Sequence, residues 1–147
     1  MKNTVEVPTP HDYIELVTVW EASVRATHHF LKEEDIQFFK PLILNEYLKA
    51  VSLYCIRDND GAIQGFMGLS PDAIEMLFIH PNFRGKGIGK ILTDYALKEC
   101  NITKVDVNEQ NEQAIGFYEK MGFKVVGRSQ TDAMGKPYPI LHMELAS

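Results

Sequence analysis

The spacing of hydrophobic residues predicts helices in the first third of the chain. Between residues 13 and 30, apolar side chains recur every three or four positions, as one face of a helix requires. The side chains at this spacing are Ile14, Val17, Trp20, Val24 and His28. A second helix is predicted from residue 32, because acidic residues occupy its first turn, where the helix dipole favours them. Pro41 is expected to kink or restart this helix before it continues to about residue 50.

Strand-like runs and two more helices follow. Residues 51–57 and 62–70 are predicted to pair as a hairpin around the turn-forming segment DNDG. Residues 73–79, AIEMLFI, are almost continuously apolar, which is typical of a strand in the middle of a sheet. The other predicted elements are a weak edge strand at 3–7, strands at 104–108, 123–130 and 138–145, and helices at about 88–99 and 111–121. This order indicates an α/β (α+β) architecture with one mixed sheet.

The composition narrows the class of protein. A chain of 147 residues, 45% of them hydrophobic, is expected to fold as a single domain over residues 1–147. The formal net charge of -5 disfavours non-specific binding of nucleic acid. Cys55 and Cys100 have neither a disulfide-framework nor a metal-ligand spacing, so no metal site is predicted. Because no membrane-length apolar run or signal peptide is seen, a cytoplasmic protein without a membrane partner is expected.

One predicted strand-to-helix turn, HPNFRGKGIGKIL at residues 80–92, gathers basic and flexible residues in this acidic chain. Glycines let the backbone approach a ligand closely, and the start of the following helix directs free amide groups toward an anion. The basic side chains add positive potential, so the turn predicts a site for two or more phosphates. The residues that carry this prediction are Arg84, Gly85, Lys86, Gly87, Gly89 and Lys90.

Two common phosphate motifs do not fit this turn. A P-loop requires Ser or Thr after Gly-Lys, but Ile91 follows Lys90. The dinucleotide fingerprint requires glycine where Lys90 stands. The segment RGKGIG at residues 84–89 instead fits R/Q-x-x-G-x-G/A and resembles the acetyl-CoA loop of the GCN5-related N-acetyltransferase (GNAT) superfamily. The segment NEQNEQAIGFYEKMGFKVVG at residues 108–127 resembles the second signature of that family, in the same order.

The resemblance implies a fold and a cofactor. The implied fold is a central, mostly antiparallel sheet of about six or seven strands flanked by about four helices. The implied cofactor is acetyl-CoA, with CoA as the product, and its pyrophosphate would lie on backbone amides of residues 84–90, where a helix begins near Ile88. In the family, the preceding strand carries a bulge and separates from its neighbour, and the cofactor arm pairs with the open edge. The residues implied beside this arm are Leu77, Phe78, Ile79, Asn111 and Asn108.

The resemblance also implies a catalytic acid. Tyr118 matches the tyrosine that the family places near the thioester sulfur. A phenol has a pKa of about 10 and a thiol of about 8.5, so a phenol is well matched to protonate the leaving thiolate. A half-buried packing role for Tyr118 is the alternative.

The acceptor is expected to be a primary amine of a small molecule, peptide or protein, which attacks directly in a ternary complex. Because an amine is mostly protonated at neutral pH, a base is needed. Glu75 is preferred, since it lies one strand period from Leu77, where burial of a carboxylate is costly; a salt-bridged Glu75 is the alternative. The histidines at 28, 29 and 80 are other candidate bases. The predicted acceptor-binding residues are His28, His29, Tyr138 and His142.

Other interpretations stay open at this point. His28 and His29 could instead contact the last carbonyl groups of their helix. An acyl-CoA-binding or sensing module without enzymatic activity is the alternative function, and a nucleotide-binding regulator is a third. An exposed terminal strand would also permit a homodimer.

Overall fold

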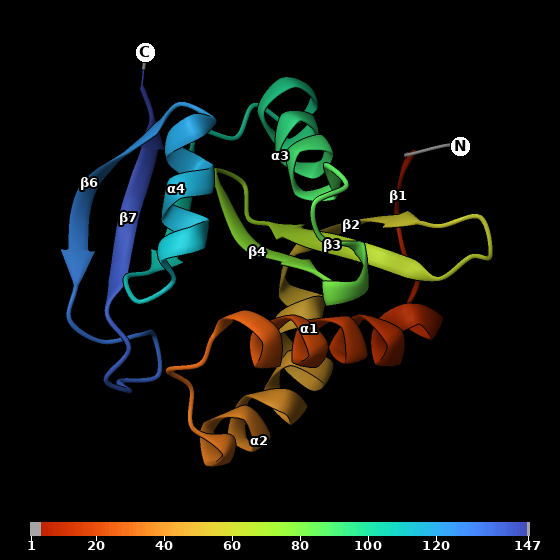
Figure 1. The fold of residues 1–147 in the computed structure, drawn as a ribbon, viewed down its shortest axis with the longest axis horizontal. Helices are drawn as coiled ribbons and strands as arrows, with labels where there is room; N and C mark the ends of the chain where they lie inside the picture. The colour runs from red at the N-terminus through yellow and green to blue at the C-terminus, as the bar shows by residue number, and fades with distance from the viewer. Residues whose placement is uncertain (1–3, 147) are drawn as a thin grey trace.

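The computed structural model describes residues 4–146, in which the strands form one seven-stranded mixed sheet (Figure 1). The strands are β1 (Val5–Glu6), β2 (Ser52–Arg57), β3 (Ile63–Leu69), β4 (Ala73–Ile79), β5 (Lys104–Asn108), β6 (Phe123–Ser129) and β7 (Ile140–Leu145). Their order across the sheet is β1-β2-β3-β4-β5-β7-β6. Neighbours are antiparallel except β4 and β5, which are parallel. The predicted mixed, mostly antiparallel sheet is therefore confirmed.

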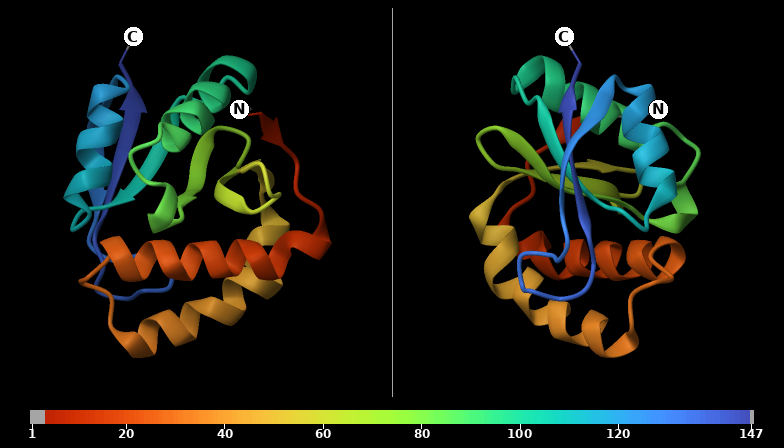
Figure 2. Two further views of the ribbon diagram at one scale, coloured as in Figure 1. Left: turned by 45° about the vertical axis from the view of Figure 1, so that its right-hand side comes forward. Right: turned by 90° about the vertical axis from the view of Figure 1, so that its left-hand side faces the viewer.

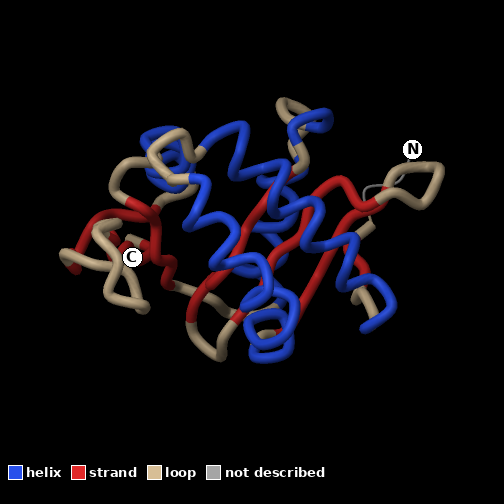
Figure 3. Tube along the Cα trace, turned by 90° about the horizontal axis from the view of Figure 1, so that it is seen from below, coloured by secondary structure: helices blue, strands red, loops and turns tan. Residues whose placement is uncertain are grey.

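Four α-helices cover the two faces of the sheet within residues 4–146. They are α1 (Tyr13–Thr27), α2 (Glu33–Leu42), α3 (Ile88–Glu99) and α4 (Glu112–Lys120). The first two lie on one side of the sheet and the last two on the other (Figure 2). Seen from below, helices cross in front of the strands (Figure 3). None of the helices described is long and apolar enough to cross a membrane.

The sequence between α1 and β2 folds nearly as predicted. Pro41 lies inside α2, and the helix continues directly into a π-helical turn (Ile43–Tyr47), so the proline does not end it. The predicted apolar stripe of α1 is buried except at its first residue. Ile14 is 73% exposed, whereas Leu16 and Val19 are buried beside Trp20.

Two hydrophobic cores result, one on each face of the sheet. The core on the α3 and α4 side includes Met67 of β3 and Leu92 of α3. The core on the α1 and α2 side includes Phe66 of β3 and Trp20 of α1. Successive residues of β3 therefore serve opposite cores, as the two-residue period of a strand requires.

A β-bulge interrupts β4. Leu69 of β3 pairs with Ile74, and Gly68 pairs with Met76, so Glu75 is an extra residue between them. The extra residue changes which side chains share a face, because a strand alternates sides at every residue. Leu77 and Ile74 both belong to the core on the α3 and α4 side, although they are three positions apart.

The parallel strands β4 and β5 separate soon after they begin. They pair only at Ala73 with Lys104 and at Ile74 with Val105. Residues 75–79 of β4 therefore have an edge that β5 does not cover. The bulge and the separation that the family resemblance implies are both present, and they open the sheet where α3 and α4 approach it.

Candidate active site

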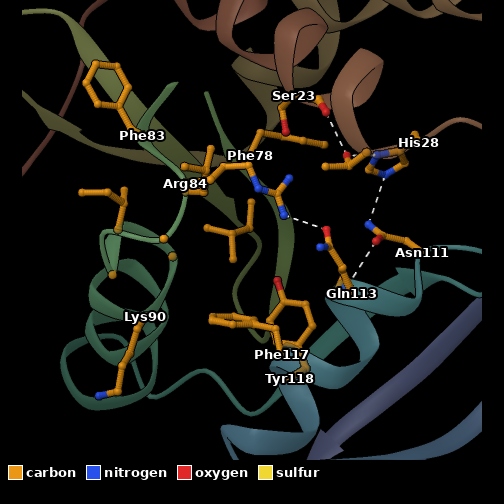
Figure 4. A pocket seen from close by; sticks show the side chains of 18 residues that line it. Ser23, His28, Phe78, Phe83, Arg84, Lys90, Asn111, Gln113, Phe117 and Tyr118 are labelled. Atoms are coloured by element: carbon orange, nitrogen blue, oxygen red, sulfur yellow. Dashed lines mark hydrogen bonds between the residues drawn. The ribbon is translucent and has the colours of Figure 1, made fainter. Parts of the chain in front are cut away.

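A cavity of about 340 Å³ lies where β4 and β5 separate (Figure 4). We call it the first cavity. Its walls come from the end of β4, the turn that leads into α3, the beginning of α4 and the end of α1. It brings together most of the predicted cofactor residues: Leu77, Phe78, Ile79, Arg84, Gly85, Gly87, Ile88, Gly89, Lys90, Asn111 and Tyr118.

The turn between β4 and α3 has the geometry of an anion cradle. Gly85 and Gly87 adopt φ of 77° and 81°, a region that side chains disfavour, and Ile88 begins α3. A Cβ atom at either glycine would meet no atom within 4 Å. In the described chain, no hydrogen bond uses the backbone amides of residues 85–90. These amides and the positive end of α3 together favour an anion.

The three cations of this turn have different surroundings. The Arg84 guanidinium donates to Gln113 Oε1 of α4 at 2.7 Å, and its side chain crosses the first cavity (Figure 4). The Lys90 ammonium pairs with Asp94 further along α3, at 3.1 Å. Lys86, predicted to contribute to the site, does not line the cavity. It stands between the two glycines of the turn, and its Nζ lies 5.7 Å from the centre of the Phe83 ring.

Tyr118 presents a buried phenol to the first cavity. The residue is 5% exposed, and its ring packs edge-on against Phe117 and Phe123. Its hydroxyl points into the cavity (Figure 4). Burial raises the pKa of Tyr118 above its usual value, because the apolar surroundings disfavour a phenolate. The side chain is therefore a proton donor at neutral pH.

Asn111 and His28 join α4 to the end of α1. Asn111 is the N-cap of α4, and its Oδ1 accepts from the Ala114 amide at 3.2 Å. Its Nδ2 lies 3.4 Å from His28 Nε2. His28 is 8% exposed, and burial, helped by Arg84 and His29, lowers the pKa of His28 to about 4. The imidazole is therefore neutral at neutral pH.

A second cavity of about 530 Å³ lies between α1, α2, β4 and the segment that precedes β7. Its walls are mostly apolar, with aromatic rings from Trp20, Phe39 and Tyr47 and carboxylates from Glu75 and Asp132. Tyr138, predicted to contact the acceptor, lines it and hydrogen-bonds to Asp35 of α2. Two residues, His28 and Phe78, line both cavities, so the cavities meet there.

Glu75 and Asn108 lie elsewhere than predicted. Glu75 is exposed and lines only the second cavity, so the argument from a buried carboxylate is wrong. The cause is the bulge, which puts Glu75 out of phase with Leu77. Asn108, predicted beside the cofactor arm, also lines the second cavity and not the first, because it ends β5 and pairs with Ile140 of β7.

Three of the histidines predicted to act at the site lie outside both cavities. His29 is exposed, and its Nε2 lies 2.9 Å from the Ala26 carbonyl, which matches the alternative of a helix-end contact. His142 is held between Asp106 and Ser129, each at 2.7 Å, because β7 lies between the strands that carry them. His80 accepts from the Asn82 amide at 3.1 Å and is a turn residue.

Sequence reasoning missed residues that no local pattern marks. Gln113, which binds Arg84, stands in the first turn of α4 and resembles any polar helix residue. Asp132 reaches the second cavity from the long connection between β6 and β7, which has no periodicity. Trp20, a member of the predicted helical stripe, is 4% exposed, yet it also forms a wall of the second cavity.

The chain is similar to known acetyltransferases over most of its length. The family model of the acetyltransferase (GNAT) domain matches residues 25–145. The peptidyl-lysine N-acetyltransferase YjaB of Escherichia coli (strain K12) is 44% identical over 129 residues, which cover 88% of this chain and 87% of YjaB. The peptidyl-lysine N-acetyltransferase YiaC of the same strain is 26% identical over 123 residues, or 83% of this chain and 84% of YiaC.

Solved structures share the architecture. The solution structure of apo-form YjaB from Escherichia coli has a TM-score of 0.89 and 39% sequence identity, and the match covers 100% of this chain and 99% of YjaB. The PaiA N-acetyltransferase from Thermoplasma acidophilum, in complex with coenzyme A, has a TM-score of 0.73 at 22% identity, and the match covers 99% of this chain and 100% of PaiA. The likeness to PaiA is one of fold. The chain belongs to the GNAT acetyltransferase family and is an N-acetyltransferase.

Proposed function

We propose that the first cavity binds acetyl-CoA and that the acetyl group passes to the side-chain amine of a lysine in a polypeptide. One observation carries the proposal: the first cavity combines an anion cradle, an uncovered strand edge and a buried phenol. The cradle and the strand edge suit the two ends of a phosphorylated, amide-containing arm. The phenol stands where a leaving group would need a proton.

The residues of the cavity fit this cofactor. The unpaired amides of residues 85–90 supply donors for phosphate oxygens, and the open space above Gly85 and Gly87 lets those oxygens approach. Arg84 adds a fixed charge on the same side. The edge of β4 at residues 75–79 offers backbone groups to an amide-containing arm, in the manner of an added strand. When bound, acetyl-CoA supplies an activated acetyl thioester.

Tyr118 would then act as the acid. Its hydroxyl, which is protonated at neutral pH, donates the proton that the thiolate needs as it leaves. Burial of the ring between Phe117 and Phe123 fixes the direction of the hydroxyl.

The second cavity would receive the acceptor. Its apolar walls suit the methylene chain of a lysine, and Glu75 and Asp132 favour a cationic head. It meets the first cavity at His28 and Phe78, where amine and thioester would come together. The relatives YjaB and YiaC carry the name peptidyl-lysine N-acetyltransferase, which supports a polypeptide lysine as the acceptor.

A single substitution tests the chemistry. Tyr118→Phe removes the hydroxyl and keeps the ring, so turnover should fall about 10²–10⁴-fold while the Kd for acetyl-CoA stays within about threefold. Turnover is measured as thiol release with poly-L-lysine as the acceptor, and binding by calorimetry. Tyr95→Phe is the matched control, since Tyr95 packs against Tyr54 and lines neither cavity. Equal turnover in the Tyr118 variant and the unaltered chain would refute the assignment.

A further inference from the structure

His28 stands at the junction of the two cavities. Of the two residues that line both cavities, Phe78 carries no titratable group, so His28 is the only one with a lone pair to offer. It follows the last residue of α1, and its backbone amide bonds to the Val24 carbonyl at 2.7 Å. The end of a helix therefore holds the ring in place.

The hydrogen bonds around His28 determine its tautomer. The Thr27 hydroxyl donates its one proton to the Ser23 carbonyl at 2.8 Å, so its oxygen must accept from His28 Nδ1, 2.7 Å away. Nδ1 therefore carries the proton and Nε2 carries the lone pair. Asn111 agrees with this assignment, because its Oδ1 is engaged with the Ala114 amide and its Nδ2 faces Nε2 (Figure 4).

The lone pair of Nε2 is only weakly engaged. Its distance of 3.4 Å from Asn111 Nδ2 exceeds the usual range of about 2.7–3.2 Å for such bonds. A stronger donor in the cavity can therefore replace Asn111 at little cost.

We propose that His28 Nε2 accepts the proton of the acceptor nitrogen during acetyl transfer. The inference rests on the proposed function and assigns its general base. The acceptor ammonium first loses a proton to water, and the neutral amine then bonds to the thioester carbonyl carbon. The attached nitrogen becomes cationic, and its N–H is far more acidic than that of a free ammonium. The weakly basic imidazole of His28 suffices at that point. The C–S bond breaks and the thiolate takes its proton from Tyr118; His28 then passes the acquired proton to water, and Tyr118 regains one from water.

Other titratable groups near His28 are less well placed. Arg84 lines the first cavity with His28 and has no lone pair for this purpose, and Lys90, which also lines that cavity, pairs with Asp94. Glu75, Asp132 and Tyr138 line only the second cavity, and His29 lines neither. Glu75 and Asp132 are therefore assigned to attraction of the cationic acceptor, and His28 to the proton.

The test compares His28→Ala and His28→Gln with the unaltered full-length chain. Thiol release from acetyl-CoA is followed with Nα-acetyl-lysine amide, with poly-L-lysine and with water as acceptors, and acetyl-CoA binding by calorimetry. Both variants should lose about 10²–10⁴-fold in turnover and keep acetyl-CoA Kd within about threefold. Added imidazole should raise the turnover of His28→Ala by about tenfold or more, because the truncation leaves space for the ring. His11→Ala is the control, since His11 is exposed and lines neither cavity.

Three outcomes separate the hypotheses. Intact acetyl-CoA binding with unchanged turnover in His28→Gln would overturn the role of His28 and leave the proposed function standing. If acetyl-CoA binding and turnover fall together and imidazole does not raise turnover, His28 has only a structural role, and its role as a base is overturned. Failure of the unaltered chain to bind acetyl-CoA would overturn the proposed function itself.

Discussion

Two titratable side chains, Tyr118 and His28, are buried at the candidate active site and are both neutral at neutral pH. Burial disfavours charge, so it raises the pKa of the Tyr118 phenol and lowers the pKa of the His28 imidazole. One group is thereby kept as a proton donor and the other as an acceptor. At this scale the chemistry follows from the surroundings of each side chain, which residue type alone does not reveal.

The lowered pKa of His28 has a measurable effect on stability. The unfolded chain binds a proton at His28 below a pKa of about 6.5, whereas the folded chain resists it down to about 4. The unfolded state therefore binds more protons between these values, and stability falls as pH falls. The neighbouring Arg84 and His29 act in the same direction as burial. Between pH of about 7.5 and about 5, His28 should cost the unaltered chain about 2 kcal/mol.

Urea unfolding at those two pH values checks this result. Paired carboxylates such as Glu21, whose pKa is lowered by Lys40 and Arg25, also weaken the fold in acid, and their effect must be subtracted. His28→Gln carries the same carboxylates and should lose about 2 kcal/mol less than the unaltered chain. An equal loss in both proteins would show that burial does not perturb His28.

At the scale of elements, local sequence patterns predict the bounds of helices and strands but not the details of strand pairing. The bounds of β4 and α3 follow from sequence, because hydrophobic run and glycine turn are local signals. The bulge at Glu75 does not, because it depends on which residues of β3 lie opposite. The family resemblance implied a bulge without giving its position, and the role expected of Glu75 assumed an uninterrupted period.

The same dependence on tertiary contacts explains why the sequence does not predict most residues that line the second cavity. The glycine turn, Tyr118 and Asn111 lie in two continuous segments, so a motif identifies them together. The second cavity draws on residues from α1, α2, β4 and the connection before β7, whose approach is set by tertiary packing. His142, predicted to contact the acceptor, instead bonds to Asp106 of β5 and Ser129 of β6, and only strand pairing brings these partners to it.

The connection between β6 and β7 gives a prediction at this scale. Asp35 of α2 binds this segment twice, through the Lys136 ammonium at 2.8 Å and through the Tyr138 hydroxyl. Asp35→Ala should loosen this wall of the second cavity and raise the KM for poly-L-lysine about tenfold, with acetyl-CoA Kd unchanged. Glu33→Ala is the matched control, because exposed Glu33 lies in the same helix and pairs with Arg25. KM is measured by steady-state kinetics and Kd by calorimetry on both variants. A KM equal to that of the control would show that this segment does not shape the acceptor site.

At the scale of the whole molecule, the two cavities lie beside different pairs of helices. The first cavity opens beside α3 and α4, and the second lies among α1, α2 and the segment before β7. They meet at the open edge of β4, where the strand has parted from β5. In the proposed function, acetyl-CoA and the acceptor would meet there from different sides, as direct transfer between them requires.

Calorimetric titration with acetyl-CoA of the unaltered chain, Gly87→Val and Gly61→Val tests the central claim most directly. Gly87 and Gly61 adopt φ of 81° and 87°, and a Cβ at either meets no atom within 4 Å, so both variants carry similar backbone strain. Gly87 lines the first cavity, whereas Gly61 lies in the turn between β2 and β3. The unaltered chain and Gly61→Val should bind one acetyl-CoA alike, and Gly87→Val about 100-fold more weakly, which corresponds to about 2.7 kcal/mol. Undiminished binding by Gly87→Val, or no binding by the unaltered chain, would contradict a cofactor site in the first cavity.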